Sequence, residues 1–475
     1  MLTFRHTPDI QLVNVFSEPY NNAVATARTC YSSKVIDVED VKSKTEMRDR
    51  IASSIYQAGH HTTLQHAHVQ FTMSGVSRHF LWSFLHAHPF YNSEQQSQRY
   101  VHVKPGNIIE PEFNNPQAQA IYQAGIQDQT DTYELLTEKL TPVAARNYYG
   151  IFKARQKQSE KYDKEVQKKA QEVARYVLPV GTFANLYHTV SLLSLLRYYH
   201  MAKQADTPAE TWAIMDTMVQ QVLAYDPLIA KVLEDPLNFE DMPESAFWQA
   251  PRTGAQDFIR HFDSQLEGRV SKLVDYKLHG ESVMAEAVRE VLGLTPTQMS
   301  DADALRQVLD PAVNTLLSST MNNNTLSKLS RAMHHPHYTF RKKISHTADS
   351  QDQRHRMVPG SRPILGLHLD TTPDYITPRL VLEDAECQSL YEACMNRTWD
   401  RIDQLLNLGA PLEAVSYLLP NAVSVRFSES GDLLNLHHKL KARLCYNAQE
   451  EIWQASLDEL DQICNAVYNG IVAAR

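Results

Sequence analysis

The sequence predicts a protein of the α/β or α+β class, built from two related units. Patterns typical of strands and of helices alternate in both halves of the 475-residue chain. A chain of this length is expected to form about two to three domains, each able to bury a core of its own. Several landmarks recur in the same order in both halves, which indicates a diverged internal duplication.

The repeated landmarks follow nearly constant offsets. They are HAH at 66–68 and HPH at 335–337, VS at 76–77 and IS at 344–345, and YVLP at 176–179 and YLLP at 417–420. The first two pairs lie 269 and 268 residues apart and the third lies 241 residues apart, as one deletion would produce. Chance similarity of two α/β segments is the alternative, and ordered landmarks with constant offsets argue against it.

Local patterns predict the elements of the first half. Apolar residues at helical spacing predict a helix at 45–58, which Gly59 would end. Alternating residues predict a strand at 67–73, and 76–86 is interpreted as a buried helix. The polar segment 93–100 has poor helix propensity and is expected to be a loop.

Further along the chain, longer helices are expected. Residues 151–170 are interpreted as a solvated charged helix, 185–201 as an apolar helix and 432–457 as a second helix pattern. Residues 236–262 are rich in Pro, Gly and acidic residues and are interpreted as a linker or covering loop. The predicted organisation is a first domain at 1–235, a linker at 236–262 and a second domain at 263–475.

Composition excludes several classes of protein. The net charge of −9 does not suit a sequence-blind nucleic-acid binder, although a few arginines in a cleft suffice for a phosphate. Five cysteines without a C-x-x-C pair argue against a disulfide scaffold or a structural zinc site and fit a reducing compartment. With no signal-like N-terminus and no apolar run of about 18 residues, a cytoplasmic protein without a membrane span is expected.

The histidines concentrated between 60 and 88 raise the question of a metal site. Metal ligands must converge within about 2.1 Å of the ion. These histidines straddle a helix end, a strand and another helix without sharing one face, so we expect no metal.

Two polar segments carry residue types suited to an anionic ligand. Within 93–100, Ser and Gln side chains and Arg99 can surround a phosphate with donors, whereas a solvated loop is the alternative. Arg354, His355 and Arg356 form a basic triplet that suits a phosphate or an anionic reduced flavin. A surface basic triplet is the alternative there.

A third segment, 442–452, is expected to lie within a helix. Arg443 follows an apolar seam, where an arginine needs a partner. The alternative is an arginine that extends to solvent or pairs with Glu450 or Glu451.

Together these segments resemble the flavin-dependent thymidylate synthases, over most of both halves. ARTCYSS at 27–33 resembles the family's opening motif, and GHHTTLQH at 59–66 resembles its GHxSPLEH segment. QQSQRY at 95–100 matches the substrate loop that holds the dUMP phosphate, and Arg175 stands at a dUMP-binding arginine. In this half the family's RHR motif falls on 86–89, without its arginines. Ala202 and Lys203 stand where the substrate-activating arginine belongs, and Ser191 replaces a flavin-binding Asn.

The second half resembles the complementary part of the family pattern. The helix from Ser345 ends in Arg354, His355 and Arg356 at the flavin motif, and Gln351 falls on a dUMP-contacting Gln. Arg443 falls on the arginine thought to ionise the pyrimidine N3. This half lacks the GHxSPLEH segment, keeps only 360–362 of the substrate loop, and has Ser416 in place of the dUMP-binding arginine. Asp432 and His438 replace flavin-contacting asparagines.

Because family sites lie at subunit interfaces, the complementary losses suggest one composite site in an intramolecular pseudo-dimer. The second copy would supply the flavin motif and the activating arginine, and the first copy the phosphate loop and Arg175. The expected residues are catalytic Arg443; substrate-binding Gln351, Gln95, Gln96, Ser97, Gln98, Arg99 and Arg175; and cofactor-binding Arg354, His355, Arg356, His60, Thr62 and His438.

The resemblance implies two thymidylate-synthase-complementing-protein-like domains, each a mixed sheet with long helices. It implies an enzyme that converts dUMP to dTMP with FAD, NADPH and methylenetetrahydrofolate. Two alternatives stay open: a catalytically degenerate nucleotide- or flavin-binding homologue, and a flavin-dependent methyltransferase acting on another uracil-containing substrate. Whether the chain stays a pseudo-dimer or forms a homodimer, a pseudo-tetramer, is also open.

Overall fold

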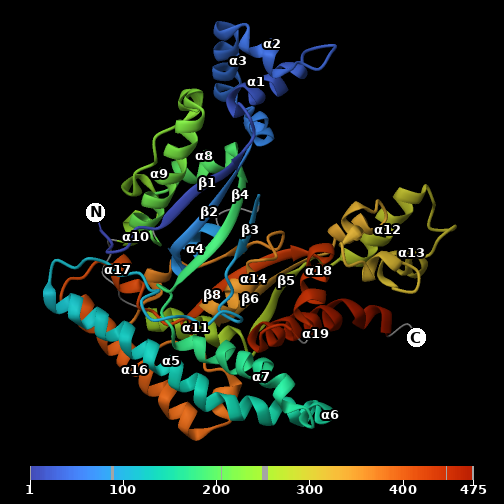
Figure 1. The fold of residues 1–475 in the computed structure, drawn as a ribbon. Helices are drawn as coiled ribbons and strands as arrows, with labels where there is room; N and C mark the ends of the chain where they lie inside the picture. Colours follow the sequence, from blue (N-terminus) through green and yellow to red (C-terminus); the bar gives the residue numbers. More distant parts are fainter. Residues whose placement is uncertain (1, 87–89, 205, 249–254, 446, 473–475) are drawn as a thin grey trace. The chain divides into compact units, whose positions relative to one another are not determined.

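The protein, seen here in a computed structural model, forms two compact units, and each is described by itself. The structure describes residues 2–86, 90–204, 206–248, 255–445 and 447–472. Unit 1 comprises Met1–Arg252, Ile364–Pro373 and Arg379–Asn421, and unit 2 comprises Thr253–Pro363, Asp374–Pro378 and Ala422–Arg475. Each unit combines a sheet with helices (Figure 1), which confirms the α+β class.

Each unit contains one four-stranded sheet of the same strand order. Unit 1 holds β1 Asp9–Val15, β2 His68–Ser77, β3 Tyr91–Gln95 and β4 Phe183–Ser191, and unit 2 holds β5 Ser271–Tyr276, β6 His337–Ser345, β7 Gly360–Ser361 and β8 Ser424–Asp432. The orders are β1-β2-β4-β3 and β5-β6-β8-β7. All described pairs are antiparallel, so the sheets are antiparallel where mixed sheets were expected.

Helices cover both sheets. In unit 1 they are α1 Pro19–Thr29, α2 Val38–Lys42, α3 Thr45–Gln57, α4 Arg78–His86, α5 Pro116–Ile151, α6 Lys153–Gln156, α7 Ser159–Ala174, α8 Leu192–His200, α9 Pro208–Tyr225, α10 Ser245–Trp248, α15 Arg379–Leu382, α16 Ala385–Asn407 and α17 Leu412–Ser416. In unit 2 they are α11 Ala255–Gln265, α12 Gly280–Leu292, α13 Asp301–Leu309, α14 His346–Asp352, α18 Leu433–Arg443 and α19 Glu450–Val472.

The same side-chain contacts recur inside the two units. Ser77 at the end of β2 donates from its N and Oγ to Glu210 of α9, at 2.8 and 2.6 Å. Ser345 at the end of β6 makes the same two bonds to Glu451 of α19, at 2.5 and 2.7 Å. These four residues obey the offsets of 268 and 241 found in the sequence.

A second recurring contact ties the edge strand to the last helix of each copy. Gln221 of α9 accepts from Leu12 N and donates to Ile10 O, both on β1. Gln462 of α19 accepts from Leu273 N and donates to the Ser271 carbonyl of β5. Contacts repeated at a constant offset are the structural counterpart of the predicted duplication.

Some predicted elements match the structure closely. The helix expected at 45–58 is α3, and Gly59 follows it with φ 75°, a conformation that favours glycine. The buried helix expected at 76–86 is α4, seven of whose nine residues are buried. In both cases the signals are local: apolar spacing and a helix-ending residue.

Other predictions were wrong at particular residues. The helix expected at 185–201 begins only at Leu192, because the preceding residues form β4, which pairs with both β2 and β3. The pattern at 432–457 is divided into two helices, α18 and α19. The segment 442–452 therefore contains the end of α18 and the start of α19 instead of one continuous helix. Ser93 to Gln95 of the expected loop lie in β3. Strand pairing overrides local helical spacing in β4 because it uses distant partners.

Residues of the expected linker take part in ordered structure. From Ala255 onward the chain forms α11, in which Ile259 and Phe262 are buried. Asp263 of α11 accepts a two-point contact from Arg426, at 2.7 and 2.9 Å. Residues 249–254 lie outside the described part of the chain.

Segments 364–373 and 379–421, from the second half of the sequence, belong to unit 1. Helix α16 packs along α5, the orange and cyan helices of Figure 1. Arg397 and Arg401 of α16 pair with Asp128 of α5 at 2.7 and 2.6 Å. The compact units are therefore not the same segments as the predicted sequence repeats. The repeat boundaries at 235 and 263 stay a prediction.

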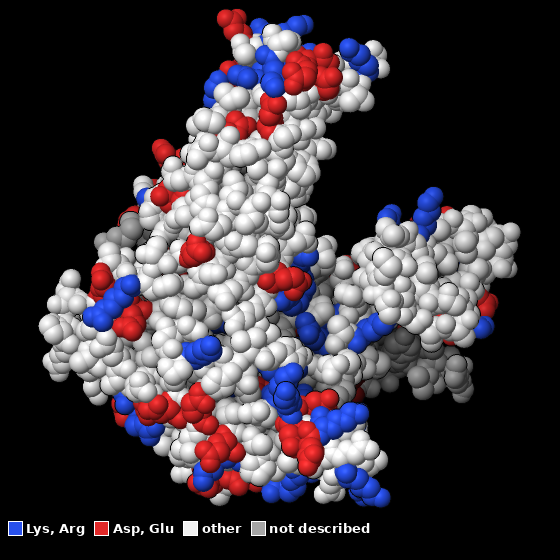
Figure 2. Space-filling model, in the orientation of Figure 1, with Lys and Arg blue, Asp and Glu red and all other residues white. Residues whose placement is uncertain are grey.

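The surface on the face drawn in Figure 2 carries acidic and basic side chains intermixed. Among the described residues, no helix combines the length and apolar character that crossing a membrane requires. Within the same residues no group of three or more His, Cys, Asp or Glu side chains is arranged to hold a metal ion.

Candidate active site

Helix α14 of unit 2 carries the predicted basic triplet just past its end. Ser345 caps this helix by accepting from Ala348 N at 3.1 Å, which satisfies one of the free N–H groups of the first turn. After Asp352 the chain turns, and Arg354 is exposed while His355 and Arg356 are partly buried. The short helix thus presents the triplet at a turn, away from the buried body of α14.

Arg443, the last residue of α18, contacts this turn. Its Nε donates to His355 Nε2 at 2.8 Å, and its Nη2 donates to the Gln351 carbonyl at 2.5 Å. Gln351 in turn donates from Nε2 to Gln449 Oε1 at 2.7 Å. The structure therefore brings together Gln351, His355 and Arg443, three residues that the sequence analysis assigned to one site.

His355 is neutral in this arrangement. Burial and the adjacent charge of Arg443 lower its pKa to about 2. Because Nε2 accepts a hydrogen bond from Arg443, the ring proton is assigned to Nδ1. His438 of α18 stands edge-on to the ring of His355 with centroids 6.0 Å apart, and burial lowers the His438 pKa as well.

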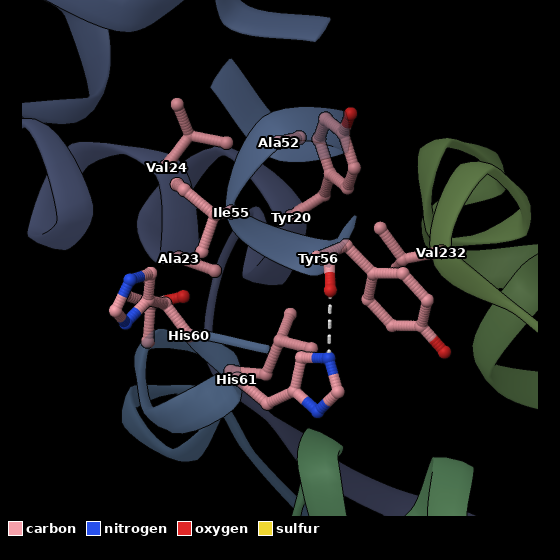
Figure 3. Close-up of a pocket in the computed structure, with 11 residues that line it drawn as sticks. Tyr20, Ala23, Val24, Ala52, Ile55, Tyr56, His60, His61 and Val232 are labelled. Carbon is pink, nitrogen blue, oxygen red and sulfur yellow. Dashed lines mark hydrogen bonds between the residues drawn. The ribbon is translucent and has the colours of Figure 1, made fainter. Parts of the chain in front are cut away.

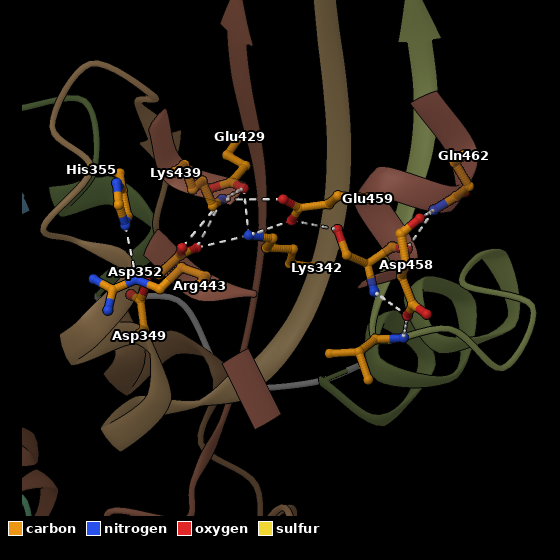
Figure 4. A network of polar contacts seen from close by, with 12 residues as sticks. Lys342, Asp349, Asp352, His355, Glu429, Lys439, Arg443, Asp458, Glu459 and Gln462 are labelled. Carbon is orange, nitrogen blue, oxygen red and sulfur yellow. Dashed lines mark hydrogen bonds and ion pairs between the residues drawn. The ribbon is translucent and has the colours of Figure 1, made fainter. Parts of the chain in front are cut away.

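A buried charge network lies beneath these residues (Figure 4). Lys342 of β6 contacts Asp352 at 2.8 Å, Glu459 at 2.6 Å and also Glu429. Lys439 of α18 contacts Asp352 at 3.2 Å, Glu459 at 3.5 Å and also Glu429. All five side chains are at most 1% exposed, so each charge depends on the others for stabilisation.

Protonation within the network follows from its composition of two lysines and three carboxylates. Burial opposes the charged form of Lys342, but the carboxylates around it raise its pKa well above the ordinary value. The two lysines likewise hold the pKa of Asp352 well below its usual range despite burial. Burial and Asp352 raise the pKa of Glu429, so Glu429 holds a proton more readily than Asp352 does.

The network fixes the two helices that carry the site. Asp352 ends α14, next to Gln351, and Lys439 lies one helical turn before Arg443 on α18. Sequence reasoning missed all five members of the network. The signal was Lys342, which lies between Phe340 and Ile344 on the inward-facing positions of an alternating strand.

Other predicted positions of the second copy serve the structure. Arg362, from the remnant of the substrate loop, makes a forked contact with buried Asp349 at 2.9 and 3.2 Å. Asp432 caps α18 by accepting from Asn435 N at 2.9 Å and also pairs with His334 at 3.0 Å. The carboxylate that replaces a family asparagine is thus engaged with its own unit.

In unit 1, the predicted phosphate loop lies against α7. Arg99 pairs with Glu172 of α7, and both side chains are largely buried. The Nε of Arg175 donates to the carbonyl of the same Glu172 at 3.2 Å. Burial lowers the pKa of Arg175, with Glu172 acting in the opposite direction. The structure therefore places the two predicted phosphate-binding arginines around one acidic residue.

Asn421, a residue that sequence reasoning missed, joins this group. Its Nδ2 donates to Gln98 Oε1 at 3.2 Å and to the Arg175 carbonyl at 3.0 Å. Asn421 follows YLLP at 417–420, so a residue from the second half of the sequence supports the loop inside unit 1. The repeated YLLP landmark marked this place in the sequence, although it did not identify the asparagine.

The remaining loop residues hold the strand edge. Gln95 pairs with Leu186 in the ladder between β3 and β4. Gln96 donates from its N to the Asn185 carbonyl at 2.8 Å and accepts from Asn185 Nδ2 at 3.0 Å. Ser97 Oγ accepts from Arg99 N at 3.2 Å, which closes the turn that carries Arg99.

His60 and Thr62 lie after α3, and both are exposed. His60 borders a small hollow of unit 1 (Figure 3), where the neighbouring His61 ring bonds to the Tyr56 carbonyl at 2.9 Å. Residues 87–89, where the first copy has lost the basic motif, lie outside the described residues.

The family described as thymidylate synthase complementing protein matches residues 11–228 and 272–467. The flavin-dependent thymidylate synthase of Clostridium tetani is 23% identical over 192 residues, covering 40% of this chain and 72% of the relative. That of Geobacter sulfurreducens is 27% identical over 235 residues, covering 47% and 82%.

A solved structure, the UMP/dUMP methylase PolB from Streptomyces cacaoi bound with 5-Br dUMP, is 14% identical with a TM-score of 0.34. The match covers 48% of this chain and 95% of that one. The two family matches together span most of the sequence, one in each half. The chain therefore belongs to the thymidylate synthase complementing protein family.

Proposed function

We propose that this protein is an FAD-dependent thymidylate synthase that methylates dUMP to dTMP, with methylenetetrahydrofolate as carbon donor and NADPH as reductant. Family membership supports the reaction class. The single observation that carries the proposal furthest is the contact of Arg443 with neutral His355 and with Gln351.

Arg443 is the proposed activating group. A guanidinium remains charged at any working pH, so it stabilises negative charge that develops at N3 and O2 of the uracil. The neutral His355 accepts a hydrogen bond from Arg443 Nε, and this bond orients the guanidinium. Because His355 carries no charge, it does not neutralise the positive charge of Arg443. Gln351, whose side chain is held by Gln449, is the proposed amide contact to the pyrimidine.

Arg99 and Arg175 are the proposed phosphate anchors, with Gln95, Gln96, Ser97 and Gln98 as further donors and acceptors of the loop. Arginine recognises phosphate through forked hydrogen bonds. Glu172 orients both arginines and reduces their net charge. The phosphate would therefore bind between two arginines whose combined positive charge one carboxylate already offsets in part.

Arg354, His355 and Arg356 are the proposed flavin contacts, with His60, Thr62 and His438. The donor set fits the group, because two arginines beside a neutral histidine suit an anionic ring or a pyrophosphate. FAD, when bound, supplies the hydride that completes the methyl group. His438, packed edge-on against His355, holds that ring in place.

The proposal assigns one nucleotide site to groups from both copies. Its support is the sequence pattern, in which each copy keeps the motif residues that the other copy lacks. If it is right, Arg99→Ala raises KM for dUMP about tenfold, whereas Arg443→Ala lowers kcat by about 10² to 10³. If Arg99→Ala had no effect on dUMP kinetics, the hypothesis of a composite site would be wrong, whereas the proposed reaction class would not be affected.

The test of the reaction is release of tritium from 5-tritiated dUMP, dependent on NADPH and the folate, with flavin-replete protein. Arg260→Ala is the matched control, because this arginine of unit 2 is highly exposed and pairs with Asp257 one helix turn away. Release at the wild-type rate in Arg443→Ala, or none from the wild type, contradicts the proposal.

A degenerate nucleotide-binding homologue is the second candidate, favoured by Asp432. This carboxylate caps α18 and pairs with His334. It stands where the family pattern has an asparagine, whose amide would contact the flavin. The visible spectrum distinguishes the two: flavin bands support the enzyme, whereas colourless protein stabilised by dUMP but not by FAD supports the homologue. A panel of uracil-containing substrates then tests whether another nucleotide is the methyl acceptor.

A further inference from the structure

Unit 2 contains a large apolar pocket on a part of α18 that the candidate site does not use. Its empty volume is about 1380 Å³, part of it open to solvent. Side chains of α12, α18 and α19 line most of it, together with residues before β6. The apolar lining includes Met284, Leu317, Met333, Leu440, Leu460 and Ile463.

The corresponding place in the first copy is filled. Offsets of 261 and 241 carry Glu281 onto Tyr20 and Leu440 onto Tyr199, and both tyrosines belong to the continuous core of unit 1. A short helical turn, Pro227–Val232, folds back after α9 and adds Ile229 to the same core. Only a hollow with an empty volume of about 310 Å³ remains beside α1 and α3.

The second copy differs in ways that open the interior. Helix α19 continues to Val472, past the position where α9 ends, so no described segment folds back as Pro227–Val232 does. Two apolar clusters of unit 2 border the pocket, whose wall takes Met284 and Leu317 from one and Leu440 and Ile463 from the other. The apolar lining of this partly open pocket forgoes packing contacts that an apolar occupant would supply.

The polar groups of the pocket indicate the chemistry of an occupant. Lys441 Nζ already donates to the carbonyls of Leu317 and Ser319, at 3.2 and 3.1 Å, so it does not require an anion. Ser318 Oγ donates to the Thr315 carbonyl at 3.0 Å. In contrast, Oε1 of Glu281 is buried, and no described residue donates a hydrogen bond to it. Burial also raises the pKa of Glu281.

We propose that this pocket binds an apolar small molecule whose N–H or O–H group donates to Glu281. Ligand sites of this kind combine a mostly apolar lining with a few polar groups that orient the ligand. The Glu281 carboxyl is such a group, because it lines the pocket and no described residue donates a hydrogen bond to its Oε1. The site is separate from the cluster of Arg443 and His355, whose residues do not line it.

The test uses N-phenyl-1-naphthylamine, an apolar probe with one N–H whose fluorescence rises in apolar surroundings. We expect saturable binding at one site per chain. Its analogue 1-benzylnaphthalene has CH₂ in place of N–H and should compete about tenfold more weakly, because it cannot donate to Glu281. In Glu281→Leu the two compounds should bind equally well.

A matched pair of variants tests the location. Leu317→Trp places an indole in the pocket and should weaken the probe at least tenfold, since Leu317 is a buried part of the wall. Val291→Trp adds the same indole to α12 at a side chain that is 47% exposed and does not line the pocket. Unchanged affinity is expected for this control, and unchanged affinity in Leu317→Trp overturns the proposal.

A measurement on the wild-type chain does not depend on any variant folding. Cys464 lines the pocket and is exposed, while Cys30 is an exposed cysteine of unit 1. The probe should slow alkylation of Cys464 about tenfold and leave Cys30 unchanged. Equal rates with and without saturating probe overturn the proposal. None of these measurements uses dUMP turnover, so they stand or fall independently of the proposed function.

Discussion

The interiors of the two copies solve the same packing problem with opposite chemistry. At corresponding positions the second copy has Lys342, Asp352, Glu429, Lys439 and Glu459, and the first copy has Met73, Phe84, His188, Tyr198 and Met218. In unit 1 the ring of Phe84 lies 4.8 Å from that of His188 and 4.5 Å from that of Tyr198. In unit 2 the corresponding side chains form the buried charge network.

This difference coincides with the distribution of the motif residues. The charged interior occurs in the copy that keeps the basic triplet and Arg443, directly beneath the helices that carry them. Replacing a buried ionic group by apolar residues is often neutral or stabilising, so stability alone does not account for the network. The comparison teaches that one fold accepts both interiors, and that the ionic one accompanies the basic triplet and Arg443.

The largest effect is expected from Lys342→Met, which introduces the residue of the first copy at a single position. Three buried carboxylates would then face Lys439 alone, and loss of one partner of a buried ionic group costs about 3–5 kcal/mol. Denaturant unfolding, with hydrogen exchange of β6 and β8, measures this cost. Lys272→Met is the control, because its partner Glu267 is highly exposed. A loss below about 1 kcal/mol would mean that the network does not stabilise unit 2.

The next effect concerns pH and unit 1. Burial raises the pKa of Glu210 to about 7 from an ordinary value of 4.5. A raised pKa contributes stability below pH 4.5 that is lost as the pH rises through 7, about 3 kcal/mol. Between pH 4 and 8 the unfolding free energy of Glu210→Gln should fall less, or rise more, than that of the wild type. Exposed Glu160→Gln should retain the full slope, and equal slopes for all three proteins would refute the assignment.

A smaller effect sharpens the comparison through charge balance. Lys342→Met combined with Glu459→Met recreates the pair Met73 and Met218 of the first copy. Removing one charge of each sign leaves Lys439 with Asp352 and Glu429, so the double variant should lose less than about 2 kcal/mol. A double-mutant cycle measures the coupling between the two residues. Additive losses would show that the two side chains act independently.

The smallest effect tests the equivalence of the copies. Ser77 and Ser345 each end a central strand and bond to a glutamate of the last helix. Their replacement by alanine should cost a similar amount, about 1 kcal/mol each, because each hydroxyl also bonds a backbone N–H at the start of the next helix. Unfolding of the two single variants provides the measurement. A clear difference would argue that the shared contact has diverged in strength.

Sequence patterns predicted elements well where the signal was local. Helix α3 and the glycine after it follow from apolar spacing and a positive φ, which neighbouring residues specify. The strand β4 was predicted as a helix, because its register depends on β2 and β3, far away in the chain. Of the candidate site, Gln351, His355 and Arg443 were identified through family resemblance, whereas Asn421 and the lysines of the network were not.

The amino-acid sequence was sufficient for the duplication and the class of fold, and it pointed to candidate motif residues, because these depend on residue order and on chemistry that neighbours share. Three-dimensional packing was needed for the burial of Lys342 beside Asp352, for the bond from Arg443 to His355 and for the pocket bordered by Glu281. Each depends on atoms brought together from distant segments. Burial and vacant space are properties of that packing, and a one-dimensional pattern does not contain them.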